Sequence, residues 1–272
     1  MVKEMKRWKM IIIGMIVGIM LISGCTSTQD VTAETIKDNM LQAIEEVASY
    51  KYSADVTATI TMINESGTNV TETVATQNGE VDIMNKKLKQ DNIATTTGIA
   101  AGQHWIIYLV NSIQYYGIES DGNITWTSQN TSYTNESMAW ISYSALDMQT
   151  FYFEGYYENT TLERLSDEVS EGIDCYVLYL TSSQNQSGED SDTFPYLGYA
   201  SYEYEFKYWI SKDTYSLIKT QSKVTADMSG WYTFGDADRS ITTSEMVIIF
   251  YDYNVPVTIE VPSEALEESM FY

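Results

Sequence analysis

A long and regular alternation of apolar and polar residues dominates the first third of the chain. Over residues 50–62 every second residue is apolar or small, and the residues between them are polar. A repeat of two places successive side chains on opposite faces of a β-strand. One face of this strand is therefore expected to be buried and the other to meet water, as in an antiparallel sheet.

Shorter strand-like segments follow this long one and are separated by turn residues. Residues 64–67 predict a turn, and Asn78-Gly79 predicts a tight hairpin turn because this pair tolerates positive φ. Residues 182–200 and 230–240 have the composition of loops. The expected strands are 50–62, 70–77, 80–84, 104–110, 113–118, 123–128, 173–181, 203–210, 216–226 and 243–251. Helical patterns do not alternate with them, which excludes a parallel α/β fold.

Two helical segments are expected among these strands. Thr32 suits a helix N-cap, and the apolar residues Ile36, Met40, Ile44 and Val47 follow it at helical spacing. This helix has to bury its apolar stripe against another element. The apolar residues of 137–153 fit one or two short helices better than a strand.

Three later segments resemble one known protein family. They are GIDCYVLYL at 172–180, YWISKDTYSLIK at 208–219 and YDYNVPVTIEVPSEA at 251–265. Together with a helix that leads directly into a long strand, they resemble the LolA-like superfamily of exported lipid-handling proteins, which includes LolA, LolB and the LppX/LprG-type lipoproteins. In that family a Trp-Ile-Asp-Lys type turn joins two strands, and here Ser211 stands where Asp is usual. The resemblance covers most of residues 32–268.

The resemblance implies both a fold and a kind of ligand. The fold is mainly β (α+β): a curved antiparallel half-barrel of roughly ten strands, with the N-terminal helix and a short helical segment on the concave side. The ligand is an apolar small molecule, a lipid or an isoprenoid, bound in the half-barrel cavity. Family site residues do not transfer by position, so the cavity-lining candidates come from the apolar rows of the helix and the long strand. They are Ile36, Met40, Ile44, Val47, Tyr52, Ala54, Val56, Ala58 and Ile60.

A second interpretation needs no cavity. The half-barrel could be filled by its own side chains and act as a non-enzymatic cell-envelope interaction or sensor module with a protein partner. A dry apolar cavity favours lipid carriage, whereas a packed core favours the interaction module.

The N-terminus has the features of a lipoprotein signal peptide. Lysine and arginine residues among the first nine positions precede an apolar run over residues 10–22. At about 1.5 Å per residue, this run is too short to cross a hydrocarbon core about 30 Å thick. The sequence Ile-Ser-Gly before Cys25 resembles the lipobox of prokaryotic lipoproteins, whose cysteine is acylated and becomes the new N-terminus.

The expected organisation follows from this leader. We expect a signal peptide over 1–24, a lipidated tether over 25–31 and a single LolA-like domain over 32–272. Lipid on Cys25 would anchor the chain in the cell membrane, on the extracytoplasmic face. The membrane is then one expected partner and an envelope protein another.

Charge and composition exclude several functions. A net charge of −23 at pH 7 repels phosphate backbones, so no nucleic-acid partner is expected. The chain has one histidine, His104, expected to be structural, and a second cysteine, Cys175, expected in a buried strand. One histidine and one further cysteine are too few for a His/Cys zinc site, and a structural His104 leaves no base for a Ser–His–Asp triad. We expect no metal, no cofactor and no enzymatic activity; a carboxylate-based glycan-active hydrolase is the less favoured alternative.

Asn-X-Ser/Thr sequons recur in and near the predicted turns. They begin at Asn64, Asn69, Asn123, Asn130, Asn135, Asn159 and Asn185. Such sites accept glycans, which indicates an exported glycoprotein. A bias toward Ser and Thr is the alternative explanation. Sequons together with a lipobox would suit an archaeal cell surface.

Overall fold

The computed structural model describes residues 31–97, 102–131, 140, 143–153, 159–187, 199–230 and 237–268. Residues Ala33–Tyr272 form one compact unit and Met1–Thr32 another. The sheet and helices described below belong to the unit Ala33–Tyr272. Two residues of the sequence predictions, Cys25 and Asn135, lie outside the described residues.

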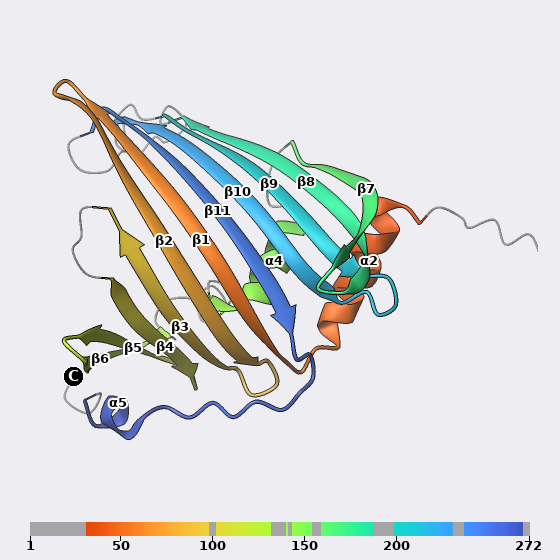
Figure 1. Ribbon diagram of the computed structural model, residues 1–272, viewed down its shortest axis with the longest axis horizontal. Coiled ribbons are helices and arrows are strands. Elements are labelled where there is room, and N and C mark those ends of the chain that lie inside the picture. Colours follow the sequence, from red (N-terminus) through yellow and green to blue (C-terminus); the bar gives the residue numbers. More distant parts are fainter. Residues whose placement is uncertain are drawn as a thin grey trace, which may run out of the picture. The chain divides into compact units, whose positions relative to one another are not determined.

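Eleven strands of the described residues form one continuous antiparallel sheet (Figure 1). The strands are β1 (Ser49–Asn64), β2 (Gly67–Asp82), β3 (Lys87–Thr96), β4 (Gln103–Val110), β5 (Ile113–Ser120), β6 (Asn123–Asn130), β7 (Thr161–Ser170), β8 (Ile173–Ser187), β9 (Tyr199–Ser211), β10 (Leu217–Ser229) and β11 (Arg239–Tyr251). Their order across the sheet is β6-β5-β4-β3-β2-β1-β11-β10-β9-β8-β7. The sheet therefore consists of two meanders, joined where β1 pairs with β11.

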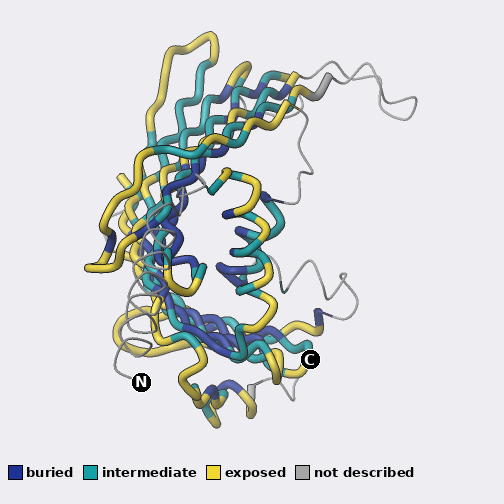
Figure 2. Tube along the Cα trace, turned by 90° about the vertical axis from the view of Figure 1, so that its right-hand side faces the viewer, coloured by how far each residue is buried: buried dark blue, intermediate teal, exposed yellow. Residues whose placement is uncertain are grey.

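Helices α2 (Ala33–Glu45) and α4 (Ala145–Phe153) lie on one face of the sheet, which curves around them (Figures 1 and 2). Helix α2 packs against β7 and α4. The opposite, convex face of β4–β6 is covered by the C-terminal segment. There Ile259, which precedes α5 (Ser263–Glu268), and Ala265 within α5 pack with Tyr108, Tyr115 and Trp126.

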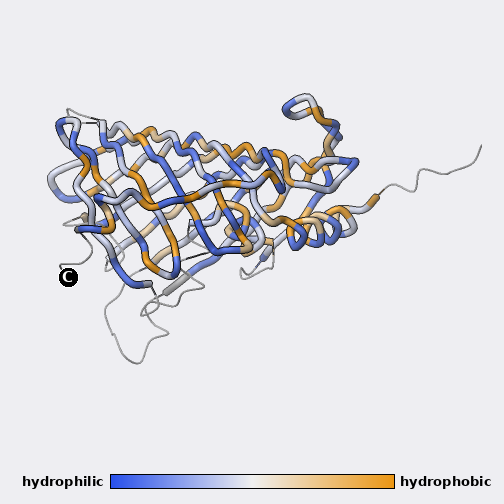
Figure 3. Tube along the Cα trace, turned by 90° about the horizontal axis from the view of Figure 1, so that it is seen from below, coloured by the Kyte–Doolittle hydropathy of each residue, from blue (hydrophilic) through white to orange (hydrophobic). Residues whose placement is uncertain are grey.

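The alternation along β1 determines which of its side chains are buried. Tyr50, Tyr52 and Ala54 are buried on the face that α4 covers, whereas Asp55 and Thr57 are exposed on the other. Figure 3 shows this change of hydropathy from residue to residue along the strands. The predicted mainly β fold, with an N-terminal helix and a short helical segment on the concave side, is confirmed.

The predicted hairpin turn at Asn78-Gly79 is wrong. Both residues lie inside β2, and Gly79 pairs with Tyr52 of β1. A Cβ on Gly79 would stand 1.9 Å from Cε1 of the Tyr52 ring, so the glycine serves close packing here and does not form a turn. The chain instead turns after Asp82, where Lys86 adopts a positive φ of 50°.

Two strands were missed, and their side chains explain why. On its concave face β3 carries Leu88, Gln90, Asn92 and Ala94, and the two amides interrupt the apolar alternation. At the edge of the sheet, β7 is mostly exposed and has an irregular register between Leu165 and Glu168. The predicted loops are also shorter than expected, because β8 continues to Ser187, β9 begins at Tyr199 and β11 begins at Arg239.

Candidate ligand-binding face

The N-terminus of helix α4 is organised by Ser144. The Ser144 Oγ accepts a hydrogen bond from the backbone N of Asp147 at 3.4 Å, as an N-cap side chain does. Its hydroxyl also donates to the Asp147 carboxylate. The same carboxylate accepts a hydrogen bond from Nε1 of Trp140 at 3.1 Å. The helix therefore begins at a defined residue above the sheet.

Tyr50 of β1 holds this helix terminus against the sheet. Its hydroxyl accepts a hydrogen bond from the backbone N of Leu146 at 3.0 Å and lies 3.0 Å from Ser144 Oγ. Because the Ser144 proton is already given to Asp147, Tyr50 is the donor to Ser144. Burial raises the pKa of Tyr50 far above its usual value, so the phenol stays protonated and keeps this role.

The other end of α4 lies on an aromatic stack along β9. The ring centroids of Tyr152 and Phe206 are 4.4 Å apart, and those of Phe153 and Tyr208 are 4.2 Å apart. Along β9, neighbouring rings over 202–208 follow at 6.2, 6.4 and 6.0 Å. Since β11 and β10 stand between β1 and β9, helix α4 crosses the middle of the concave face.

Farther along β1 the concave face carries small and apolar side chains, which we call the apolar strip. Val56, Ala58 and Ile60 of β1 are half-buried. Ala75 of β2 pairs with Val56, and Ala94 of β3 pairs with Ala75, which puts the three on one face of the sheet. Small side chains leave room above a sheet, and the half-buried side chains are in contact with solvent.

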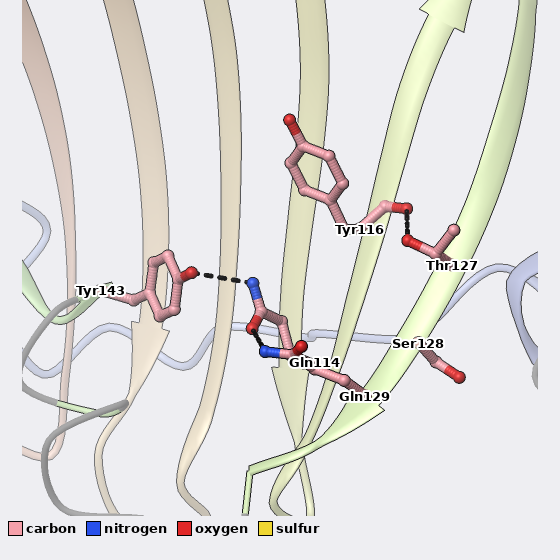
Figure 4. Close-up of a pocket in the computed structure, with 6 residues that line it drawn as sticks. All are labelled: Gln114, Tyr116, Thr127, Ser128, Gln129 and Tyr143. Carbon is pink, nitrogen blue, oxygen red and sulfur yellow. Dashed lines mark hydrogen bonds between the residues drawn. The ribbon is translucent and has the colours of Figure 1, made fainter. Parts of the chain in front are cut away.

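A pocket of about 410 Å³ opens on the same face at the β5–β6 edge of the sheet (Figure 4). Register places it in line with Tyr52, because successive pairs connect Tyr52 through β2, β3 and β4 to Tyr116 of β5 and Thr127 of β6. The lining residues are uncharged, with amide, hydroxyl and aromatic side chains: Gln114, Tyr116, Thr127, Ser128, Gln129 and Tyr143.

A chain of hydrogen bonds orders the floor of this pocket. Gln129 Nε2 donates to Gln114 Oε1 at 2.9 Å, and Gln114 Nε2 donates to the Tyr143 hydroxyl at 2.8 Å (Figure 4). The Tyr143 proton and Gln129 Oε1 lie at the two ends of this chain. The pocket therefore presents both a donor and an acceptor without any formal charge.

The predicted cavity-lining residues fall into two groups. Buried in the core are Ile36, Met40, Tyr52 and Ala54; half-buried are Ile44, Val47, Val56, Ala58 and Ile60. The β1 members share the concave face: Tyr52 and Ala54 lie in the packed region that α4 covers, and the other three lie farther along the strand. Helix α2 packs against β7, so Ile36, Met40 and Ile44 lie at the other side of the same face. The predicted helical stripe was too long at its end, because α2 stops at Glu45 and Val47 follows it. Their contact with a ligand stays a prediction.

The pocket residues were not among the predicted ones, although two sequence signals mark the segments that lie beside or carry them. Ser144 and Asp147 have the spacing of a capping box, which marks the start of α4. In the expected strand 113–118, the alternation assigns Gln114 and Tyr116 to one face. Both amide and phenol are ambiguous between core and surface, so their burial could not be read from residue type alone.

His104 lies on the opposite face of the sheet, away from the pocket. It bridges two strands, since its Nδ1 bonds to the Glu119 carboxylate of β5 and its Nε2 lies 3.0 Å from Asp91 Oδ1 of β3. The hydrogen bond to Glu119, more than that to Asp91, raises the pKa of His104. Each ring nitrogen is thus held by a carboxylate of the sheet, which fits the structural role expected of this residue.

Several other features of the described residues bear on function. No group of three His, Cys, Asp or Glu side chains in them is placed to hold a metal ion. None of their helices combines the length and the apolar composition needed to cross a bilayer. Cys175 is fully buried in β8, as expected. The described sequon asparagines are all exposed: Asn64, Asn69, Asn123, Asn130, Asn159 and Asn185.

Several solved structures are similar to this chain over most of its length. LprF from Mycobacterium bovis matches with a TM-score of 0.42 and 11% identity, over 85% of this chain and 96% of that one. A LolA superfamily protein from Nitrosomonas europaea matches with a TM-score of 0.22 and 12% identity, over 86% of this chain and 96% of that one. A putative outer membrane lipoprotein-sorting protein domain from Vibrio parahaemolyticus matches with a TM-score of 0.27 and 10% identity, over 84% of this chain and 94% of that one.

No protein-family model matches the sequence, and no curated protein matches it.

Proposed function

We propose that this chain binds an apolar ligand, a lipid or an isoprenoid, on the concave face of its sheet. The observation that carries the proposal is the apolar strip. Val56, Ala58 and Ile60 expose apolar surface beside a packed core instead of being buried in it. Filling the strip with an acyl chain stabilises the complex by about 25 cal/mol for each Å² of apolar surface removed from water.

The pocket at the β5–β6 edge suits the polar end of such a ligand. It lies on the same face as the strip, holds about 410 Å³ and has an uncharged donor and acceptor chain through Gln114. A ligand with an apolar chain and a small uncharged polar end would match the two surfaces.

The proposal includes the location of the protein. The chain would be exported, cut before Cys25 and anchored by lipid on the extracytoplasmic face of the cell membrane, where the tether keeps the concave face near the bilayer. Exposure of the described sequons supports glycan attachment there. No catalytic step is proposed, since binding and release suffice for a carrier.

One observation favours the interaction or sensor module as a second candidate. Under α4 the concave face is filled by the protein's own side chains, with Tyr50, Tyr52, Phe206 and Tyr208 all buried. If this packing extends over the whole face, the protein would act through a protein partner instead.

Native mass spectrometry of the membrane-purified protein, with lipid extraction, separates these candidates. Wild type should carry a bound lipid. Ala58→Phe fills the strip and should lose it, whereas Thr57→Phe adds the same ring on the exposed face and should keep it. Lipid bound equally to all three, or to none, would refute binding on this strip, and the second result would favour the interaction module.

A further inference from the structure

The side chain of Gln149, on helix α4, is buried without a hydrogen-bond partner. It is 0% exposed, and among the described residues neither its Oε1 nor its Nε2 is bonded. Other buried amides of the concave face are paired: Gln90 donates to the Tyr52 hydroxyl, and Asn92 accepts from Gln77. A buried amide left unpaired is costly, and its donors and acceptor are open to a partner from outside the chain.

The place of Gln149 on α4 shows which surface it faces. Leu146 and Phe153, three residues before and four after it, are buried on the same side of the helix. The Leu146 end is bonded to β1, and the Phe153 ring lies on β9. Since β11 and β10 stand between those strands, Gln149 lies over the middle of the concave face, on the buried side of the helix.

The surroundings of this amide restrict what it can bind. A primary amide offers two donors and one acceptor and carries no charge. The nearest carboxylate on its helix, that of Asp147, is already bonded to Ser144 and Trp140. No cation of the helix stands by to neutralise an anion, because α4 contains no Lys, Arg or His. A neutral carbonyl or hydroxyl is therefore the group that fits.

We propose that the bound lipid buries a neutral carbonyl or hydroxyl group against Gln149. This inference rests on the proposed function and adds the class of ligand: acyl esters or lipid alcohols, in preference to pure hydrocarbons and to lipid anions. Gln149 acts by giving the polar atom of the ligand a hydrogen bond inside an otherwise apolar contact.

Competition binding on the purified full chain in detergent tests the inference. The neutral dye N-phenyl-1-naphthylamine is bound first and then displaced by methyl oleate, oleate or 1-octadecene. For wild type, methyl oleate should displace the dye at about tenfold lower concentration than 1-octadecene, as expected for one added hydrogen bond in a dry site. Oleate at neutral pH should be weaker than the ester.

The Gln149→Met variant keeps the length of the side chain and removes the amide. It should bind 1-octadecene as wild type does and lose the preference for methyl oleate. Met148→Leu, the neighbouring substitution, should keep that preference. An equal response to ester and hydrocarbon in wild type, or a preference that survives in Gln149→Met, overturns the inference. Failure of the dye to bind wild type at all would instead refute the proposed function.

Discussion

Replacing Tyr50 with Phe tests whether one phenol holds α4 to the sheet. The substitution keeps the buried ring, so it opens no cavity, and it removes only the hydroxyl. That oxygen is the partner of the Leu146 backbone N and of Ser144 Oγ, both at 3.0 Å. Leu146 is 1% exposed and Ser144 is 0% exposed, so water cannot replace the lost partner without a rearrangement.

The expected cost can be worked from these two bonds. Leaving a buried donor unpaired costs about 1–3 kcal/mol, and a lost neutral hydrogen bond costs about 1 kcal/mol. We therefore expect Tyr50→Phe to lower the free energy of unfolding by about 3 kcal/mol. Tyr179→Phe is the matched control, because its hydroxyl donates to Glu205 at 2.7 Å on the exposed face. That change should cost less than about 0.5 kcal/mol.

Urea denaturation of both variants, followed by tryptophan fluorescence and by circular dichroism, measures the two costs. The chain has six tryptophans, so their fluorescence follows unfolding of the whole molecule, and Trp140, bonded to Asp147 at the helix start, contributes to it. Hydrogen exchange should show faster exchange at the N-terminal turn of α4 in Tyr50→Phe alone. Equal stability of the two variants would mean that α4 is held by its aromatic contacts with β9 and that the Tyr50 network contributes nothing.

Three further predictions concern other parts of the chain. Gly79→Ala should lower the free energy of unfolding, measured by urea denaturation, by about 2 kcal/mol or more, because the new Cβ would stand 1.9 Å from the buried Tyr52 ring. The control Gly102→Ala should change this free energy little, because its new Cβ would have its nearest contact at 3.4 Å. Cys25→Ser should shift the protein from the membrane fraction to the soluble fraction, and unchanged fractionation would contradict the lipobox interpretation. The pKa of His104 is raised in the folded chain, so protonated His104 stabilises the fold fully below its ordinary pKa of 6.5 and loses this effect as pH rises through the raised value. His104→Gln should therefore lower the unfolding midpoint more at pH 6 than at pH 9.

The long strand shows what the sequence predicts well. Its two-residue period gave the correct faces over 50–62, because an apolar row has only one way to be buried in a sheet covered on one side. The turn propensity of Asn78-Gly79 misled the prediction, because Gly79 lies inside β2 and packs against the ring of Tyr52. Local propensity was overridden by a contact with a residue distant in the sequence, which no local pattern contains.

The candidate site was less predictable than the fold for a related reason. Gln114 and Gln129 are common surface residues, and only the pairing of β5 with β6 brings them to Tyr143. Burial of Gln149 depends on the direction in which α4 crosses the sheet. That direction is set by Tyr50 at one end and by the β9 rings at the other, and both lie far from the helix along the chain.

The pairing of β1 with β11 has a consequence for how the chain folds. Within each meander, neighbouring strands are consecutive in sequence, so these contacts form with little loop-closure entropy. The central seam joins the first strand to the last, with Tyr52 opposite Phe250, and it cannot form until nearly the whole chain has emerged. A chain that stopped before Arg239 would leave β1 and β10 as two unpaired edges in the middle of the sheet. Such edges pair readily between molecules, so we expect truncated chains to aggregate instead of forming a smaller sheet.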